Sequence, residues 1–383
     1  MKVKLGEVCT VVSGTTPSTN ISEYWNGANN WITPAELSDD SFIIYESKRK
    51  ITETAVKKSG LSSFPAGTVL LTSRAPIGKV AIAGVEMYCN QGFKNLICSK
   101  YIHNEYLFWF LKGNSKFLNS LGRGATFKEI SKSIVENIDI PLPDIEEQHE
   151  IANAFKKLSY VIAMRKKQLQ TLDDLVKSRF VEMFGDIICN DKGWHQRIFS
   201  EIATSRLGKM LDAKQQTGKH SYPYLANFNV QWFHFELKSL NQMDFDEDDQ
   251  IEFALQDGDL LVCEGGEIGR CAVWHNEIQP CFFQKALHRV RCDRSIILPD
   301  YLAWWFKYNC EHGGFSAIEG AKATIAHLPG AKLKSLIVAV PPVSVQEEFV
   351  TFVAQTDKSK LTIQQSLDKL EQIKKALMQK YFD

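Results

Sequence analysis

The chain of 383 residues has no net charge and no long hydrophobic run. Its 45 lysine and arginine residues balance 45 aspartate and glutamate residues, which excludes a histone-like protein that holds nucleic acid by bulk positive charge. No stretch approaches the roughly 18 apolar residues of a membrane-spanning helix, and the first residues lack the apolar core of a secretory signal. We therefore expect a soluble, cytoplasmic protein that does not associate with membranes.

The sequence also lacks the short motifs of metal sites, disulfide frameworks and nucleotide chemistry. Its nine cysteines include no Cys-x-x-Cys pair, so reduced, partly buried thiols are expected. There is no His-Glu-x-x-His motif, no GxxxxGK[ST] phosphate loop and no adenine-methyltransferase tetrapeptide of the NPPY or DPPF type. These absences predict a chain that needs no metal and no cofactor of its own.

The dominant feature that is present is an internal repeat of about half the chain. Residues 64–82 align without gaps on residues 255–273, with Gly67 opposite Gly258, and the pattern Tyr-Leu-x-Trp at Tyr106 recurs at Tyr301. With 44% hydrophobic residues, each half can bury its own core. The repeat therefore predicts two similar globular units.

Each half has the same internal pattern. Short apolar runs around glycine turns predict strands at residues 68–72 and 78–83, and short helices are expected at 105–112 and 301–308. Alternating strands follow and stop at Pro143 and Pro341. After each proline, apolar residues recur at steps of four and three, which predicts a long helix with a heptad seam. Gly185 predicts the end of the first of these helices.

This order predicts an α+β protein with a pseudo-twofold internal repeat, in which two similar mixed α/β units are separated by two long antiparallel coiled-coil helices. The expected boundaries are 1–145 for the first unit, 146–184 for the central helix, 185–343 for the second unit and 344–383 for the C-terminal helix. The helices are apolar enough to contact a partner protein as well as each other. The residues predicted to do so are Phe155, Leu158, Ile162, Leu169, Leu172, Val176, Ile363, Leu367, Leu370 and Leu377.

Twin units with twofold symmetry suit a target in two parts, and duplex DNA has matching local symmetry. Basic side chains near glycine-containing turns are suited to contact phosphates and base edges. The candidates in the first unit are Lys48, Arg49, Arg74, Lys79 and Arg123. Those in the second unit are Arg270, Lys285 and Lys322. An acidic run at residues 244–249 is interpreted as a solvated loop.

Taken together, these motifs resemble the specificity subunit of type I restriction-modification systems. The first half matches through Leu5-Gly-Glu-Val, Ser13-Gly-Thr-Thr-Pro17, Asn90-Gln91-Gly92, and Ile140-Pro-Leu-Pro143 leading into Glu147-Gln148. The second half repeats this order more loosely through Gly265-Gly266, Ile268-Gly269-Arg270, Gln284-Lys285-Ala286, and Pro341-Pro342 leading into Gln346-Glu347. The order, the duplication and the end-to-end coverage carry the resemblance.

The resemblance implies that each unit is a target recognition domain that reads one half of a bipartite sequence in double-stranded DNA. It adds DNA-binding candidates from the matching motifs and their repeats, namely Thr15, Thr16, Ser18, Gln91 and Thr126 in the first unit and Lys209, Gln284 and Thr324 in the second. It implies that the helices set the spacer and dock methyltransferase (M) subunits, two per chain, and that motor-nuclease (R) subunits join through the complex. The chain itself would be non-catalytic. S-adenosylmethionine, ATP and Mg would be bound by the partner subunits.

The residues alone leave two other functions open. A coiled-coil adaptor that does not bind DNA would have similar helices, since basic turns are common on protein surfaces. A stand-alone nuclease could use Asp40, Glu46 and Lys48, which form a loose D…ExK pattern that the second half lacks.

Overall fold

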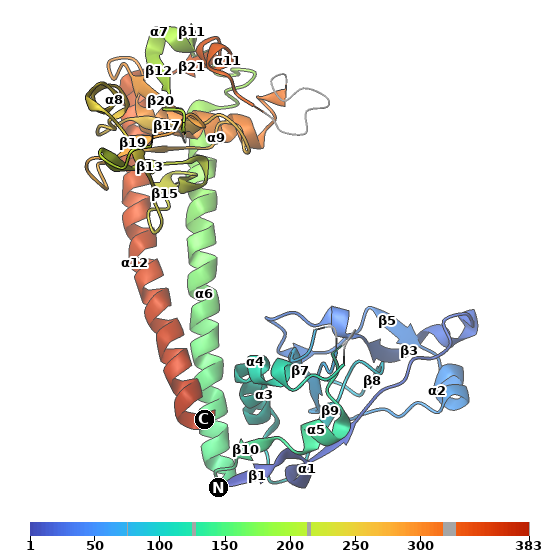
Figure 1. The fold of residues 1–383 in the computed structure, drawn as a ribbon. Coiled ribbons are helices and arrows are strands. Elements are labelled where there is room, and N and C mark those ends of the chain that lie inside the picture. Colours follow the sequence, from blue (N-terminus) through green and yellow to red (C-terminus); the bar gives the residue numbers. More distant parts are fainter. Residues whose placement is uncertain (75, 125–127, 213–215, 317–326, 383) are drawn as a thin grey trace. The chain divides into compact units, whose positions relative to one another are not determined.

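A computed structural model describes residues 1–74, 76–124, 128–212, 216–316 and 327–382. The chain divides into two compact units (Figure 1). Unit 1 comprises Met1–Lys167 and Gln364–Asp383, and unit 2 comprises Gln168–Ile363. No helix in the described ranges has the length and apolar character needed to cross a membrane.

Unit 1 contains a five-stranded sheet in the order β2-β9-β6-β7-β4, a three-stranded sheet β5-β3-β8 and the pair β1-β10. Its strands are β1 Lys2–Lys4, β2 Cys9–Val12, β3 Trp25–Ile32, β4 Ile43–Ile44, β5 Arg49–Ile51, β6 Val69–Leu71, β7 Val80–Ala83, β8 Tyr88–Cys89, β9 Asn95–Cys98 and β10 Asp139–Pro141. Its short helices are α1 Leu5–Val8, η1 Ser22–Tyr24, η2 Pro34–Glu36, α2 Glu53–Ser59, α3 Asn104–Gly113, α4 Ser115–Ser120 and α5 Lys132–Glu136.

Unit 2 repeats this plan with a four-stranded sheet β12-β20-β17-β18, a three-stranded sheet β16-β13-β19 and the pairs β11-β21 and β14-β15. Its strands are β11 His195–Ile198, β12 Ala203–Leu207, β13 Ser221–Leu225, β14 Val230–Gln231, β15 His234–Phe235, β16 Asn241–Asp244, β17 Leu260–Cys263, β18 Cys271–Val273, β19 Phe282–Phe283, β20 Leu287–Cys292 and β21 Ile337–Val340. Its short helices are α7 Phe199–Ile202, η4 Asn227–Asn229, α8 Glu247–Phe253, α9 Pro299–Glu311 and α11 Gly330–Lys334.

The cores of the two units repeat the same contacts. The buried hydroxyl of Tyr106 on α3 donates to the carbonyl of Pro141 at 2.8 Å, and that of Tyr301 on α9 donates to the carbonyl of Ala339 at 2.9 Å. In both units this bond joins the principal short helix to the strand that precedes a long helix. The predicted mixed α/β repeat is therefore confirmed, because residues far apart in sequence make equivalent bonds in each copy.

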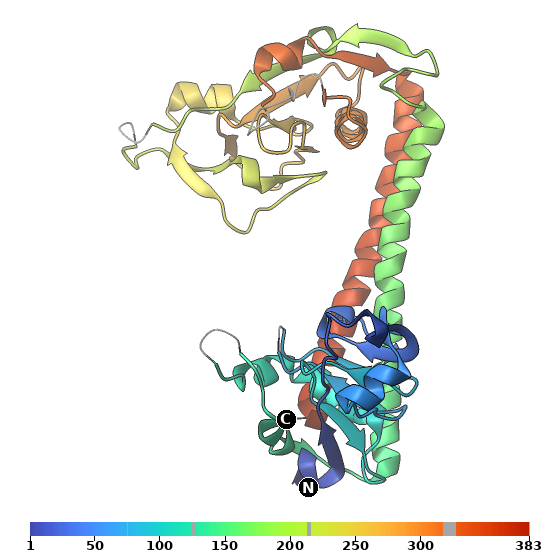
Figure 2. The same cartoon turned by 90° about the vertical axis from the view of Figure 1, so that its right-hand side faces the viewer.

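The two long helices are α6 Ile145–Phe184 and α12 Val343–Phe382. Within each unit, the segments of these two helices lie side by side (Figure 2). In unit 1, Lys166 pairs with Glu371 at 3.0 Å, and in unit 2, Lys360 pairs with Asp173 at 2.7 Å. A second contact in each unit gives the direction: Phe155 packs on Phe382 in unit 1, and Arg179 pairs with Glu348 in unit 2. Residue numbers rise along α6 as they fall along α12, so the helix segments are antiparallel within each unit. Helix α6 ends where the sequence predicts, because Gly185 has a φ of 72°, a left-handed conformation that favours glycine after a helix.

Candidate nucleic-acid interface

Each unit brings together the same two loops. In unit 1, the loop after β2 meets the loop after β8, where the Thr16 hydroxyl donates to the Gln91 side-chain oxygen at 2.5 Å. In unit 2, the loop after β12 meets the loop after β19, where the backbone N–H of Lys285 donates to the carbonyl of Lys209 at 2.9 Å. We call these the loop pairs of units 1 and 2.

A glycine makes each close approach possible. A Cβ atom on Gly14 would lie 1.9 Å from the carbonyl oxygen of Cys89, and one on Gly208 would lie 2.4 Å from that of Gln284. Both distances are far below van der Waals contact, so neither position accepts a side chain without moving the backbone. The two glycines occupy equivalent positions in the repeat, so the loop pair is duplicated together with the rest of the unit.

In unit 1, two tryptophans of β3 connect the loop pair to β5. The indole N–H of Trp31 donates to the carbonyl of Thr15 at 3.1 Å, and that of Trp25 donates to the carbonyl of Ser18 at 3.2 Å. The Arg49 guanidinium lies 3.7 Å from the centroid of the Trp25 ring, close enough for a cation–π contact. The structure thus brings together five predicted residues, here called the unit 1 loop cluster: Thr15, Thr16, Ser18, Arg49 and Gln91.

Two further arginines border this cluster. The backbone N–H of Ser73 donates to the carbonyl of Gly92 at 2.8 Å, which brings the segment of Arg74 to the loop that carries Gln91. Arg74 and Arg123 each form an isolated bridge with Glu129 through the backbone, so the exposed Arg123 lies on the same side of the unit. Lys48 is exposed next to Arg49, whereas Thr126 falls outside the described residues.

Lys79 and Arg270 are equivalent in the repeat, and both hold short 3₁₀ segments. The Lys79 ammonium donates to the carbonyl of Leu37, directly after η2, at 2.6 Å. The Arg270 guanidinium donates to the carbonyl and the side-chain oxygen of Asn227 in η4 at 3.1 and 2.7 Å. Both cations are half-buried and make hydrogen bonds inside their own unit. Their main contribution in this structure is therefore to position loops.

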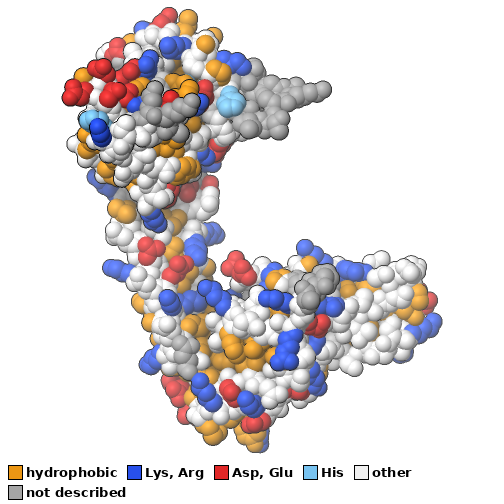
Figure 3. Space-filling model, in the orientation of Figure 1, with side chains coloured by type: hydrophobic (Ala, Val, Ile, Leu, Met, Phe, Trp, Pro, Cys, Tyr) orange, Lys and Arg blue, Asp and Glu red, His pale blue; other side chains and the backbone are white. Residues whose placement is uncertain are grey.

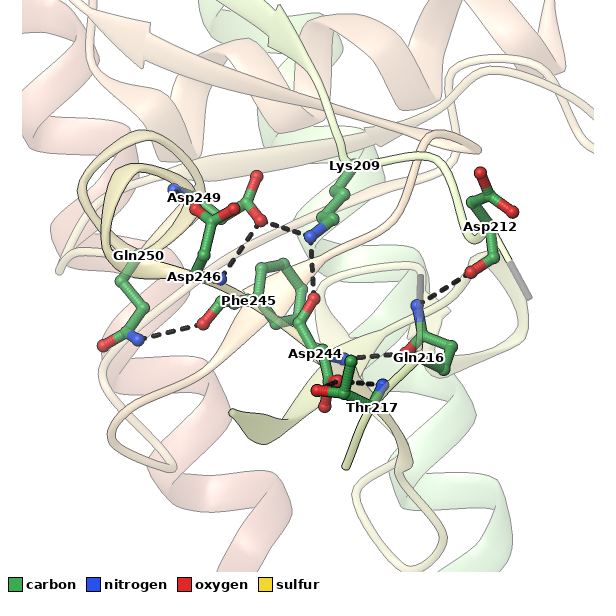
Figure 4. Close-up of polar contacts among 9 residues, drawn as sticks. All are labelled: Lys209, Asp212, Gln216, Thr217, Asp244, Phe245, Asp246, Asp249 and Gln250. Carbon is green, nitrogen blue, oxygen red and sulfur yellow. Dashed lines mark hydrogen bonds and ion pairs between the residues drawn. The ribbon is translucent and has the colours of Figure 1, made fainter. Parts of the chain in front are cut away.

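Lys209 of the unit 2 loop pair is engaged within the protein (Figure 4). Its ammonium donates to the carbonyl of Asp244 at 2.7 Å and forms an ion pair with the Asp249 carboxylate. The Asp244 carboxylate accepts a hydrogen bond from the Thr217 hydroxyl at 2.7 Å, and this bond is the main cause that lowers the pKa of Asp244. Lys209 and Asp244 therefore link the loop after β12 to the start of α8.

The interpretation of residues 244–249 as a loop is wrong, although Asp246, Glu247 and Asp248 are exposed to solvent as expected. Asp244 ends β16 and is buried, and the Asp246 side chain caps α8 by accepting a hydrogen bond from the backbone N–H of Asp249 at 2.9 Å. Acidic side chains gather on the surface over α8 (Figure 3). The negative charges in the first turn of α8 also interact favourably with the positive, N-terminal end of the helix dipole. An acidic run at a helix start thus has a structural function here.

The remaining DNA-binding candidates of unit 2 that the structure describes are Lys285 and Gln284, which differ in how far their side chains are exposed to solvent. Lys285 is exposed and Gln284 is half-buried beside it, with Gln284 paired to Lys209 as an isolated bridge. Lys322 and Thr324 lie outside the described residues. Within the described part of unit 2, Lys285 is therefore the candidate cation that projects from the loop pair into solvent.

Asp40, Glu46 and Lys48, the residues of the possible nuclease pattern, do not belong to a group of side chains that could bind a metal ion among the described residues. Glu46 forms an ion pair with Lys50 at 2.9 Å, and the backbone N–H of Lys48 donates to a Glu36 carboxylate oxygen at 2.6 Å. Across the described ranges, no three His, Cys, Asp or Glu side chains are grouped so that they could hold a metal ion. The contacts of this segment therefore maintain the turn before β5.

The ten helix residues predicted to bind a partner are buried or half-buried. Phe155 stacks on Phe382 with ring centroids 5.6 Å apart in unit 1, and Val176 belongs to the core of unit 2. Other apolar side chains of the helices face solvent instead. These are Ile145, Tyr160, Val161, Met164, Leu175, Val181, Leu361 and Ile373.

Two similar mixed α/β modules, each with a loop pair and with segments of the two long helices, define a protein built from an internal repeat. Residues 1–174 and 191–375 match the family model described as the type I restriction modification DNA specificity domain. The chain belongs to this family.

Relatives and solved structures agree with this assignment. The chain is 38% identical over 217 residues to the type I restriction enzyme MjaIX specificity subunit of Methanocaldococcus jannaschii, a match that covers 52% of this chain and 50% of that protein. It is 28% identical over 192 residues to the EcoR124I/EcoR124II specificity subunit of Escherichia coli, covering 45% of this chain and 47% of the relative. The chain thus spans about half the length of these curated relatives.

The fold is also similar to that of the type I restriction-modification S subunit from M. genitalium, with a TM-score of 0.60 and 14% identity over 100% of this chain and 96% of the other. A chain from a structure of type I R-M complex assembly and conformational transition gives a TM-score of 0.63 at 17% identity, covering 100% and 97%. These similarities extend the likeness of fold to the whole chain.

Proposed function

We propose that this chain is the DNA sequence-recognition subunit of a type I restriction-modification complex and is not itself catalytic. The observation that carries the proposal is the duplicated loop pair, because two equivalent sites suit a target sequence in two halves. Membership of the DNA specificity domain family over both halves of the chain supports it. Neither an adaptor function nor a nuclease function has comparable support.

Each unit reads one half of a bipartite target in double-stranded DNA. In unit 1, Arg49 and Gln91 are the base-reading candidates, since arginine pairs well with guanine and glutamine with adenine in the major groove. Thr15, Thr16 and Ser18 supply hydroxyl and backbone groups of the kind that contact phosphates. In unit 2, the exposed Lys285 and its neighbour Gln284 take this role, while Lys209 supports the loop.

Helices α6 and α12 set the spacer between the two half-sequences and dock the methyltransferase subunits, two per chain. In each unit, solvent-facing apolar residues of these helices supply a docking surface for one methyltransferase subunit; they include Tyr160 and Met164 in unit 1, and Leu175 and Leu361 in unit 2. Tyr160 and Met164 are four residues apart on α6 and therefore share one face, and adjacent exposed apolar side chains mark protein contacts. The partner subunits carry S-adenosylmethionine, ATP and Mg. Motor-nuclease subunits join through the assembled complex.

Co-expression of the chain with its methyltransferase, followed by sequencing of modified bases in the host genome, tests this proposal. We expect methylation at one bipartite motif with a fixed spacer, and none without the chain. Changing Arg49 and Gln91 to alanine should alter or abolish recognition of one half-sequence only. Replacing the exposed Lys116 of α4 by alanine is the matched control and should leave the motif unchanged. Methylation without any bipartite motif would reject the proposal.

A further inference from the structure

Two cysteines of unit 1 lie directly opposite each other on neighbouring antiparallel strands. Cys9 of β2 is paired with Cys98 of β9, and the backbone N–H of Ser99 donates to the carbonyl of Val8 at 3.0 Å. Because hydrogen-bonded and non-hydrogen-bonded pairs alternate along such a ladder, Cys9 and Cys98 form a non-hydrogen-bonded pair. Cα atoms in such pairs are about 4.5 Å apart, which lies within the range of about 4.4 to 6.8 Å found in disulfides.

The two thiols differ in access to solvent. Cys9 is buried, and a side-chain hydrogen bond with Cys98, together with burial, raises the pKa of the Cys9 thiol. Cys98 is half-buried and lines a surface pocket of about 310 Å³ with Pro65, Gly67 and Asn104. A small molecule that enters this pocket can therefore reach Cys98 before it reaches Cys9.

We propose that Cys9 and Cys98 form a reversible cross-strand disulfide with a low-molecular-weight disulfide of the glutathione class as oxidant. The Cys98 thiolate attacks one sulfur of the oxidant, which breaks its S–S bond and releases one thiol. Cys9 then loses its proton to water and attacks the Cys98 sulfur, which releases the second thiol. The two protein thiols are oxidised to one disulfide, and the oxidant is reduced to two thiols.

Unit 2 supplies an internal comparison. Ala203 of β12 is paired with Cys292 of β20, and the backbone N–H of Asp293 donates to the carbonyl of Ile202 at 2.8 Å. The register and the hydrogen-bond pattern are those of the Cys9 site, but one cysteine is replaced by alanine. The natural chain can therefore close the bond in unit 1 and not at the equivalent place in unit 2.

The proposed disulfide would also hold together the two strands that flank the unit 1 loop pair. Strand β2 ends at Val12 and leads directly into the loop that carries Thr15 and Thr16. A covalent link from Cys9 to Cys98 would join this strand to β9, which follows the loop of Gln91. This link does not depend on DNA recognition, so it can be tested independently of the proposed function.

The test treats the full-length chain with glutathione disulfide, blocks free thiols and maps peptides by mass spectrometry without reduction. We expect a peptide pair linked through Cys9 and Cys98, two hydrogen masses lighter than the separate peptides, and its loss after dithiothreitol. In the Cys9→Ser variant, Cys98 should instead keep glutathione as a mixed disulfide. Persistence of that mixed disulfide in the wild-type chain would overturn the proposal.

The Ala203→Cys variant is the matched gain-of-function control. It should acquire a second linked pair through Cys292 under the same conditions, while the first pair is unchanged. If the introduced pair forms and the natural pair does not, the geometry is suitable but Cys9 and Cys98 are not reactive, and the proposal is rejected. Circular dichroism of each variant confirms that the chain is folded.

Discussion

The buried side chain of Gln148 accepts a hydrogen bond from the backbone N–H of His103 at 2.8 Å. Its NH₂ group donates to the carbonyls of Tyr101 and Pro143, both at 3.0 Å. One amide on the first turns of α6 thus satisfies three backbone groups, two of which belong to the segment that enters α3. Three hydrogen bonds from a single buried group fix the start of α6 against the segment that enters α3.

Gln346 makes the same set of bonds at the start of α12. Its oxygen accepts from the backbone N–H of Leu298 at 2.8 Å, and its NH₂ group donates to the carbonyls of Ile296 and Pro341 at 3.0 and 2.8 Å. The glutamine that follows β10 and Pro143 in unit 1, and β21 and Pro341 in unit 2, therefore has the same structural role in both units. It orients both long helices in the same manner.

Replacing Gln148 by leucine should destabilise unit 1. The change leaves one backbone N–H and two carbonyls, all of which contact the buried Gln148 side chain, without their partner, and each unsatisfied buried group costs about 1–3 kcal/mol. We expect the free energy of unfolding to fall by about 3 kcal/mol in urea titrations of the full chain. The same change at the exposed Gln365 of α12 is the control and should alter it by less than about 0.5 kcal/mol. Equal effects at the two positions would contradict the structural role.

Lys79→Met separates a loop-positioning role from a DNA-contacting one. The variant loses the hydrogen bond from the ammonium to the carbonyl of Leu37, and bonds to charged groups contribute about 1.5–3 kcal/mol. Since Lys79 is half-buried, we expect a loss near the lower figure in urea unfolding. Lys48→Met, on the exposed neighbour of Arg49, should leave stability unchanged. If Lys79→Met kept full stability and only weakened DNA binding, Lys79 would be a direct contact instead.

Arg49→Lys tests the arginine on Trp25. Lysine keeps the positive charge but loses the planar group that stacks on the indole and can form two parallel bonds to guanine. We expect binding of the methyltransferase complex to its own target to weaken about tenfold, with little change on unrelated DNA, as measured by competition at fixed salt. An equal loss on both DNAs would mean that Arg49 contacts phosphates only.

Acid should weaken unit 1 through His103. Burial, followed by the positive charge that nearby His149 can carry, lowers the pKa of His103, Lys156 acts in the same direction, and Glu105 partly opposes them. The ring centroids of the two histidines are 3.8 Å apart. Because the unfolded chain binds this proton more readily, the free energy of unfolding should be highest above pH of about 6.5 and fall as the pH drops below that value.

The His103→Gln variant isolates this contribution. His288 of unit 2 has a pKa lowered by burial as well, so the wild-type chain should show two overlapping losses. Urea unfolding at a series of pH values should give a smaller loss below pH of about 6.5 in His103→Gln, and a smaller one again when His288→Gln is added. A pH profile that is identical in all three proteins would exclude both histidines as the cause.

The sequence predicts most of the fold because its signals are local and repeated. The heptad seam and Gly185 locate α6, and the prolines locate the strands before both long helices. The loop pairs were harder to predict, because Thr16 and Gln91 are 75 residues apart and no periodicity links them. The role of Asp246 as a helix cap was missed, although an acidic residue three positions before another one at a helix start is a usable signal.

Side chains with two possible partners were the hardest to assign from sequence. Lys79 lies in a glycine turn that would suit a phosphate contact, but its partner in the structure is a carbonyl 42 residues away. Trp25 and Trp31 connect Arg49 to the loop pair, although no local periodicity in the sequence links them to Arg49 or to the loops. A tryptophan near an arginine in adjacent strands was the available signal, and it needs strand pairing to be recognised.

Lengthening both long helices by one heptad should lengthen the DNA spacer and leave each half-sequence unchanged. Duplicating residues 166–172 in α6 and 361–367 in α12 keeps the heptad seam, and it leaves the ion pairs Lys166–Glu371 and Lys360–Asp173 within their own units. Seven residues at about 1.5 Å each add about 10 Å, equivalent to about three base pairs at about 3.4 Å.

Sequencing of methylated bases in cells that carry the variant measures the new spacer directly. Duplication in α6 alone is the control and should prevent methylation, because α6 would then be one heptad longer than α12 between the Lys166–Glu371 and Lys360–Asp173 ion pairs, and both pairs could not form together. A lengthened variant that methylates with the original spacer would show that the helices do not measure the distance.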